Sequence, residues 1–241
     1  MKFGAVPLAE AEGAILAHSV ALTKGRLRKG VVLDPPALAK LTAAGVTQVT
    51  VARMEPGDMH EDAAAERLAQ ALVPDPAAVN LRVAPASTGR VNIYATTTGV
   101  AAIDAARINA VNAVHPMVTV ATVPEWHRMA ARGMVATVKI ISYAAPSAAV
   151  ESACAAGQDA LAVRPVARTR GLLIQTSVGG RDDSAKGQRA MGQRFDRMGV
   201  AMGPKTVVPH ETDALRRALT EAGPDYDIIC VLTGSATSDL H

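Results

Sequence analysis

The last third of the chain alternates apolar runs with segments of helical periodicity. Three apolar runs predict buried strands: RGLLIQTS at 170–177, KTVVPH at 205–210 and DIICVLT at 227–233. The segments between them, 184–199 and 211–223, each place apolar residues on one face and predict helices. Strands without polar alternation that are joined by helices are typical of a parallel sheet covered on both faces. We therefore expect residues 168–241 to form a three-layer, Rossmann-like α/β domain.

The first 80 residues predict a mixed α+β segment. Two prolines open a helix-period stretch that ends at Gly45, and the alternating run VTQVTVA follows it as a strand. EDAAAERLAQAL at 61–72 predicts a second helix with acids in its first turn, where the helix dipole favours them. The Pro-rich stretch VPDPAAVN at 73–80 ends the segment, so we expect a first domain over residues 1–80.

Residues 81–157 predict a strand-rich module. Short β-branched runs separated by glycine are typical of strands, and four occur here: RVNIYATTT, GVAAID, MVTVATV and MVATVKIISYA. AARINAVNA predicts one brief helix between them, and SAAVESACAAG predicts a small helix that closes the module. The α/β domain is therefore expected to follow a mixed α+β region and a strand-rich region.

Composition narrows the function classes. The 241 residues are 49% hydrophobic and 20% charged, with a net charge of only +3, which fits a globular chain. Aromatic residues make up 2%, and no basic run carries interleaved aromatics, so we expect no nucleic-acid partner. No run approaches the roughly 20 apolar residues of a membrane span, and the start carries acids where a signal peptide is apolar. We expect a cytoplasmic protein with no membrane partner, and neither a disulfide nor a zinc site at Cys154 and Cys230.

Two loops follow strands at one edge of the expected sheet. They are QTSVGGRDDSAKG at 175–187 and TGSATSD at 233–239. Right-handed crossovers bring the carboxyl ends of parallel strands to the same edge, where ligands bind. Glycines and hydroxyl groups in such loops suit a phosphate or another oxyanion, although each loop taken alone reads equally well as a plain turn. Neither loop has the glycine spacing of a phosphate loop or a dinucleotide fingerprint.

These segments carry a family resemblance. TGSATSD, preceded by DIICVL, looks like the strand-loop motif of the MoeA/MogA-type molybdopterin-binding domain, and RGLLIQTSVGG is similar to the first strand and loop of that domain. Residues 27–58 resemble the segment that leads into it in MoeA-like proteins. STGRVNIYA and MVATVKIISYA resemble a bacterial MoeA-like subgroup in which a cytidylyltransferase-type domain follows.

The resemblance implies a role in molybdenum cofactor assembly with molybdopterin, a pterin phosphate, as the ligand. It implies that the second loop supplies backbone and hydroxyl donors to the phosphate from Thr233, Gly234, Ser235, Thr237 and Ser238. Thr176 and Ser177 would line the facing loop. Lys186, with Arg189 one turn later, would neutralise phosphate charge. Asp239 matches the loop carboxylate of the family, so it is the expected catalytic residue and the expected ligand of a hydrated Mg²⁺.

The chain departs from the family pattern at two places. Val178, Gly179 and Gly180 stand where related enzymes often show Gly-Asp-Glu, and Ser235 replaces the second glycine of the later loop. Asp182 and Asp183 would either substitute for the missing acids or cap the next helix. Binding is therefore better indicated than catalysis, and whether the chain is itself a molybdotransferase-like or nucleotidyltransferase-associated enzyme stays open.

The sequence leaves more than one hypothesis open for the function of the protein and for its partners. The first hypothesis is a molybdopterin-binding protein allied to molybdenum insertion or cytidylyl transfer. The others are a regulatory module that binds another phosphorylated metabolite, and a competence-damage-type protein of nucleotide clean-up. The last expected strand has no helix after it, so the chain looks truncated. We expect a further helix and strand, a downstream nucleotidyltransferase domain, or a second copy of the chain to cover it.

Three other features have structural interpretations. EPGDMHED at 55–62 places Asp58, His60, Glu61 and Asp62 close together, which suits either a metal site or, in the preferred interpretation, a solvated helix start. TKGRLRKG at 23–30 predicts a charged hairpin turn. The dispersed histidines have no Ser or Cys partner close in sequence and are interpreted as structural: His18, His115, His127 and His210.

Overall fold

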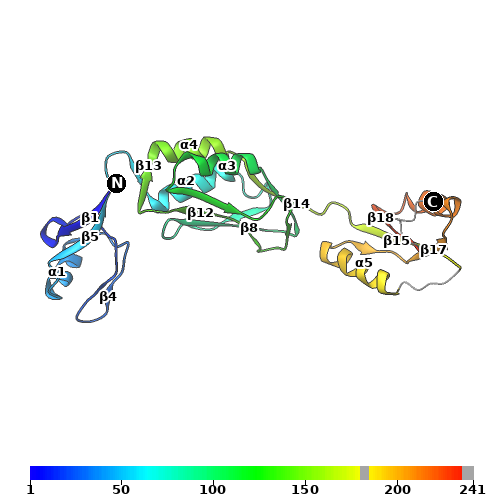
Figure 1. The fold of residues 1–241 in the computed structure, drawn as a ribbon, viewed down its shortest axis with the longest axis horizontal. Helices are drawn as coiled ribbons and strands as arrows, with labels where there is room; N and C mark the ends of the chain where they lie inside the picture. The colour runs from blue at the N-terminus through cyan, green and yellow to red at the C-terminus, as the bar shows by residue number, and fades with distance from the viewer. Residues whose placement is uncertain (180–184, 235–241) are drawn as a thin grey trace. The chain divides into compact units, whose positions relative to one another are not determined.

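A computed structural model describes residues 1–179 and 185–234 of the chain. The chain divides into two compact units, Met1–Arg164 and Pro165–His241 (Figure 1). The described residues form six α-helices and several small sheets, so the fold is a mixed α/β arrangement. Within the part of the chain that the structure describes, every helix is too short or too polar to cross a lipid bilayer.

The unit Met1–Arg164 begins with a small sheet and one helix. Its elements are β1 (Lys2–Pro7), η1 (Leu8–Glu10), β2 (Ile15–Leu16), β3 (Val20–Ala21), β4 (Arg26–Leu27), α1 (Pro35–Ala43) and β5 (Gln48–Arg53). β5 pairs antiparallel with both β1 and β2. Asp34 caps α1, since its side chain accepts a 2.8 Å hydrogen bond from the N–H of Ala37. The predicted helix, strand and hairpin turn are confirmed, the hairpin being β3 with β4.

A second, larger core occupies the rest of this unit. Its elements are β6 (Asp58–His60), α2 (Glu61–Leu72), β7 (Leu81–Val83), β8 (Arg90–Ala95), β9 (Gly99–Ile103), α3 (Ala105–Val114), β10 (Val118–Thr122), β11 (Arg128–Met129), β12 (Met134–Ile140), β13 (Ala144–Pro146), α4 (Ser147–Gly157) and β14 (Leu161–Pro165). The main sheet is antiparallel, in the order β10-β12-β8-β7. The predicted strand-rich character of this stretch is confirmed.

The three helices of this core gather against the main sheet. α2 contacts β8 and β12, α3 contacts β10, and α4 packs on α2 and α3 (Figure 1). One cluster of buried side chains runs from Ala64 to Val163. α2 precedes the Pro-rich stretch at 73–80, yet it packs against strands that follow that stretch. The hydrophobic face of α2 therefore finds its partners across the expected boundary at residue 80.

The unit Pro165–His241 is built on a parallel sheet. Its elements are β15 (Arg170–Ser177), α5 (Ala185–Met198), β16 (Ala201–Met202), β17 (Thr206–Pro209), α6 (Thr212–Ala222) and β18 (Ile228–Leu232). Gly171 pairs with Met202 and also with Ile228, so β16 and β18 lie on opposite edges of β15. β17 pairs with β15 farther along the edge that β16 occupies. The expected parallel sheet is confirmed here, and β16 is an additional strand.

Helices pack on both faces of β15. Leu172 and Ile174 form a small core with Ala218 of α6, while the ring of Phe195 from α5 lies against Gly171 on the other face. Successive residues of a strand point to opposite faces, so α5 and α6 cover different sides of the sheet. This gives the unit its three layers.

Two expectations about burial in this unit are wrong in detail. The helical period of residues 211–223 predicts that Leu219 lies on the inner face of α6 with Leu215, Ala218 and Ala222, but it is 37% exposed, and the buried residues of that helix are Ala214 and Ala218. β18 reads as a buried strand, yet Val231 and Leu232 are 42% and 37% exposed. The reason is position, since β18 pairs with β15 on one side and with no other described strand.

Candidate functional site

The carboxyl ends of β15, β17 and β18 meet at one edge of the sheet. In the parallel register Ser177 lies beside Pro209 of β17, and Gln175 lies beside Leu232 of β18. Residues that follow these strands are therefore adjacent although they are far apart in the sequence. Ligands of open α/β sheets bind at this edge.

Thr176 joins the three strand ends. Its Oγ1 accepts a hydrogen bond of 2.9 Å from the N–H of Gly234 and lies 2.8 Å from Nδ1 of His210. A hydroxyl group accepts and donates at once, so in the imidazole tautomer with its proton on Nε2, Thr176 donates to Nδ1. The backbone N–H of His210 also donates to the carbonyl of Ser177 at 3.0 Å. Thr176 is only 2% exposed. Its hydroxyl group therefore connects the strand ends through buried hydrogen bonds.

Gly234 is required by the close approach of the two loops. A Cβ atom at this position would lie 2.6 Å from the carbonyl oxygen of Thr176 and 3.3 Å from the amide nitrogen of Val178. Any larger residue would force the end of β18 away from the end of β15. The glycine of the sequence motif thus has a steric role here.

A pocket of about 480 Å³ opens beside this junction. Its volume falls in the range of small-molecule sites. Ser177, His210 and Glu211 contribute polar groups, and Val207, Val208 and Pro209 contribute apolar groups. Gly179 completes the wall next to Val178, whose side chain is 59% exposed. The pocket offers a mixed surface for a small molecule with both polar and apolar parts.

His210 is the site residue that sequence reasoning assigned to a structural role. It follows the last residue of β17 and both contacts Thr176 and lines the pocket. Its partner lies 34 residues away in the sequence, so no local pattern marks the pair. The sequence did offer one indication, since His210 ends the second apolar run. The carboxyl end of that predicted strand lies at the same sheet edge as the carboxyl end of the first one.

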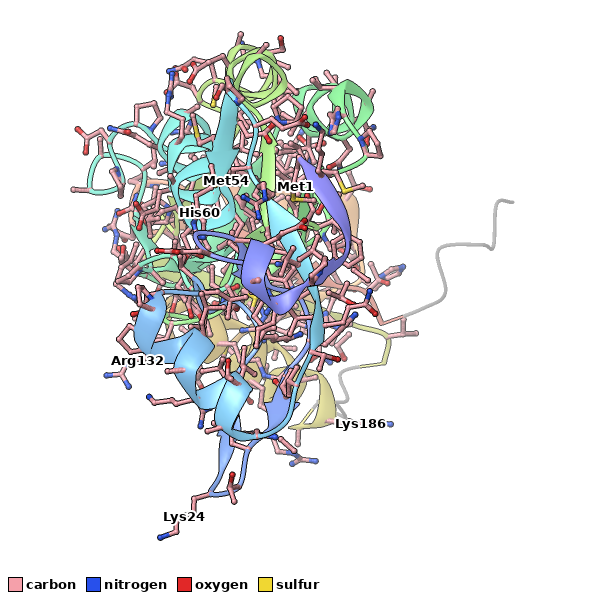
Figure 2. All side chains as sticks on the ribbon, turned by 90° about the vertical axis from the view of Figure 1, so that its left-hand side faces the viewer. Met1, Lys24, Met54, His60, Arg132 and Lys186 are labelled. Carbon is pink, nitrogen blue, oxygen red and sulfur yellow. The ribbon has the colours of Figure 1, made fainter. Side chains whose placement is uncertain are left out.

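The structure separates the remaining predicted residues into three groups. Thr176, Ser177 and Gly234 lie together at the strand ends. Thr233 is exposed at the end of β18, and Lys186 and Arg189 are exposed on the first turns of α5, where Figure 2 labels Lys186. The described residues that line the pocket include none of these three. The other predicted positions lie outside the described residues: Gly180, Asp182, Asp183, Ser235, Thr237, Ser238 and Asp239.

The acidic stretch at 55–62 has a structural role. The Glu55 N–H donates a 2.8 Å hydrogen bond to Asp58 and lowers the pKa of that carboxyl. Glu61 begins α2 and faces the Lys139 ammonium at 3.6 Å, while Asp62 accepts a 2.6 Å hydrogen bond from the N–H of Gly89. The expected helix start is confirmed, but Glu61 is 8% exposed and is therefore buried, not solvated. Among the described residues no three potential ligands group as a metal site.

Comparisons with known proteins give limited information. Residues 5–53 match a family described as "Domain of unknown function (DUF8806)", which covers most of the segment from β1 to β5. No curated protein matches the chain. A solved structure of the molybdopterin biosynthesis MoeA protein from Pyrococcus horikosii is similar with a TM-score of 0.22 and 10% identity, over 96% of this chain and 59% of that one. This chain thus spans less than two thirds of the length of that protein, and a TM-score of this size does not establish a shared fold.

Proposed function

We propose that the unit Pro165–His241 binds a phosphorylated small molecule at the carboxyl edge of its sheet, and that this ligand is molybdopterin. The observation that carries the proposal is the contact of Thr176 with Gly234 and His210, next to a pocket of about 480 Å³. We choose molybdopterin, a pterin phosphate, as the ligand because the two loop motifs resemble those of the MoeA/MogA type. The corresponding role is molybdenum cofactor biosynthesis, allied to molybdenum insertion or cytidylyl transfer.

The phosphate is assigned to the loop groups. Hydroxyl and backbone N–H groups at the end of a strand hold phosphate oxygens without a fixed cation. Ser177 and Thr233 lie at the ends of β15 and β18, and the predicted hydroxyl residues at 235, 237 and 238 continue the second loop. Lys186 and Arg189 carry long side chains that approach from the start of α5 when the ligand is bound. Asp239 and Mg²⁺ stay a prediction of the motif, and no chemical step is derived through them.

The proposal includes a setting for the protein. We place the binding step in the cytoplasm, and we assign the transfer chemistry to a nucleotidyltransferase domain or to another protein that receives the ligand. A second copy of this chain is the alternative partner. The exposed apolar side chains of β18 favour a partner at that edge, since uncovered apolar area costs free energy.

One observation favours a second candidate function. Glu211 is a carboxylate in the pocket wall, and the described lining holds neither lysine nor arginine. Such a wall suits a singly phosphorylated ligand better than a di- or triphosphate, because a carboxylate repels phosphate oxygens. Molybdopterin is itself a phosphomonoester, so this wall fits it and other phosphomonoesters alike, and a regulatory module that binds another phosphomonoester is the second candidate. A nucleotide clean-up role is less well supported by this wall.

The test is ligand binding by the full chain. The purified protein is examined for pterin fluorescence, and its thermal unfolding is measured with molybdopterin, with a set of sugar phosphates and with inorganic phosphate. We expect molybdopterin to raise the melting temperature, because a ligand that binds only the folded state stabilises it. Gly234→Ala should abolish that shift, and Gly192→Ala in α5 should retain it. A shift with sugar phosphates alone supports the second candidate, and no shift with any phosphate refutes both.

A further inference from the structure

Gln175 carries an unsatisfied polar atom beside the candidate site. It precedes Thr176 on β15, and only 6% of the residue is exposed. Its side-chain Oε1 is buried and has no hydrogen-bond partner within residues 1–179 and 185–234. Among the described residues it is the one buried side-chain oxygen or nitrogen in this state. A buried acceptor without a donor costs free energy, and the preceding residues Leu172, Leu173 and Ile174 show that this part of β15 accommodates apolar side chains.

The strand register places Gln175 on the pocket side of the sheet. Side chains alternate along β15, so Gln175 shares a face with Leu173 and Ser177, opposite the face that packs on α6. Its lateral neighbours are Val207 of β17 and Leu232 of β18. Ser177 and Val207 both line the pocket. Gln175 is therefore a neighbour of two residues of the pocket wall, although it does not itself line the pocket.

The neighbours of Gln175 argue against a bound water as the missing partner. A buried water needs two to four polar groups around it. Leu173, Val207 and Leu232 are apolar, and Ser177 is the one polar side chain among the neighbours named above. Val207 and Leu232 are 39% and 37% exposed, Leu232 because β18 is an edge strand of the described sheet. A flat ring laid over these two side chains would cover apolar surface and bring a donor to the amide between them.

We propose that Gln175 is a specificity residue that recognises the ring of the ligand, accepting a hydrogen bond at Oε1 from a ring N–H or exocyclic amino group. The ligand class is a phosphorylated heterocycle with an amide-like N–H donor, and the inference rests on the proposed phosphate site. Because Oε1 is closed to solvent, the side chain rotates toward the pocket when the ring binds. The hydrogen bond that Oε1 then accepts from the ring favours this rotation.

The experiment compares two probes on the full chain by calorimetry. Pterin-6-ylmethyl phosphate carries ring and phosphate, and ribose 5-phosphate carries the phosphate without a heterocycle. We expect the wild type to bind the pterin probe about tenfold more tightly than ribose 5-phosphate, because the ring adds one hydrogen bond to Gln175. Gln175→Leu should lose most of this ratio, keep its affinity for ribose 5-phosphate, and unfold at the same or a higher temperature without ligand. Loss of an unsatisfied polar group explains the last effect, which a merely structural glutamine would not give.

The outcomes separate this inference from the proposed function. If both probes bind and Gln175→Leu keeps the wild-type ratio, the assignment of Gln175 is wrong and the phosphate site stands. If neither probe binds, the phosphate site is wrong and the inference falls with it. Should Gln175→Leu fail to fold, the side-chain amide resonance of Gln175 in the wild type decides: it must shift with the pterin probe and not with ribose 5-phosphate, and an unmoved resonance refutes the inference.

Discussion

The backbone N–H of Gly234 donates a hydrogen bond to Oγ1 of Thr176 at 2.9 Å, across 58 residues of sequence. The same hydroxyl lies 2.8 Å from Nδ1 of His210. One side chain of β15 thus holds the residues that follow β18 and β17, its two neighbours in the sheet. The geometry of the candidate site depends on this hydroxyl more than on any charged group near it.

Thr176→Val should loosen the site and the unit together. The substitution keeps the shape of the side chain but removes the hydrogen-bond partner of the Gly234 N–H and of His210 Nδ1. Losing a hydrogen bond in a buried place costs about 1–3 kcal/mol, so we expect the free energy of unfolding to fall by that amount. Phosphate ligands should bind more weakly because the two loops separate. Urea denaturation and calorimetry measure the two effects.

Thr176→Ser is the matched control for the hydroxyl. It retains Oγ and should keep ligand affinity near the wild-type value. Equal stability and equal affinity of the Val and Ser variants would show that the hydroxyl does not hold the loops.

Local pattern predicted the parts of this fold that depend on neighbours in sequence. The bounds of α2 at 61–72 follow from its acids and alanines, and the end of β15 at 177 follows from its apolar run, whereas β18 covers 228–232 and is one residue shorter at each end than predicted. β16 was missed because two residues, Ala201 and Met202, are too few to show a period. The place of His210 in the site was missed because it depends on the pairing of β17 with a distant strand.

Glu61 shows the same limit in the unit Met1–Arg164. Acids in a first helical turn usually face water, and the sequence supports that interpretation. The burial of Glu61 is caused by the turn at Gly89 and by Lys139, which lie 28 and 78 residues away along the chain. The sequence around residues 55–62 contains neither Gly89 nor Lys139, so it cannot predict the burial of Glu61.

Gly89→Ala should destabilise the unit Met1–Arg164. Gly89 has a φ of +68°, and a Cβ atom there would clash with Oε2 of Glu61 and lie 2.9 Å from the carbonyl oxygen of Ile140. The left-handed backbone costs about 1–2 kcal/mol for a residue with a Cβ, and overpacking adds about 1–3 kcal/mol. Gly45→Ala is the control, because Gly45 has a φ of +77° and open space around it. Chemical denaturation should show the larger loss for Gly89→Ala, and equal losses would contradict the clash.

Gly171→Ala should weaken the face of the sheet under α5. A Cβ atom at Gly171 would lie 2.5 Å from Cε2 of Phe195, whose side chain is 1% exposed and has little room to move. We expect a loss of about 1–3 kcal/mol in the free energy of unfolding. Gly192→Ala provides the opposite case, since its nearest neighbour is Cε of Met202 at 3.7 Å and alanine favours the helix by about 0.5–1 kcal/mol. A stable Gly171→Ala protein would mean that Phe195 can repack.

Asp227 closes the sheet at the end opposite the candidate site. Its carboxylate accepts hydrogen bonds of 3.0 Å from the N–H groups of Thr169 and Arg170 and lies 3.3 Å from the Arg170 guanidinium. The two backbone donors, and after them the guanidinium, lower the pKa of Asp227 to about 2. An unfolded aspartate titrates near about 3.9. The ionised form is therefore favoured in the folded state.

The stability that Asp227 contributes should depend on pH in one direction. Because the folded pKa is the lower one, the contribution is fully present above about pH 5 and is lost as the pH falls toward about 2. Asp227→Asn should lower the free energy of unfolding at pH 7, and its difference from the wild type should narrow over that window. Asp225→Asn, at an exposed position two residues earlier, should change little at neutral pH. Urea denaturation at several pH values measures the difference. A gap that stays constant from pH 7 to pH 2 would mean that backbone geometry, and not the charge of Asp227, holds this end of β15 and β18 together.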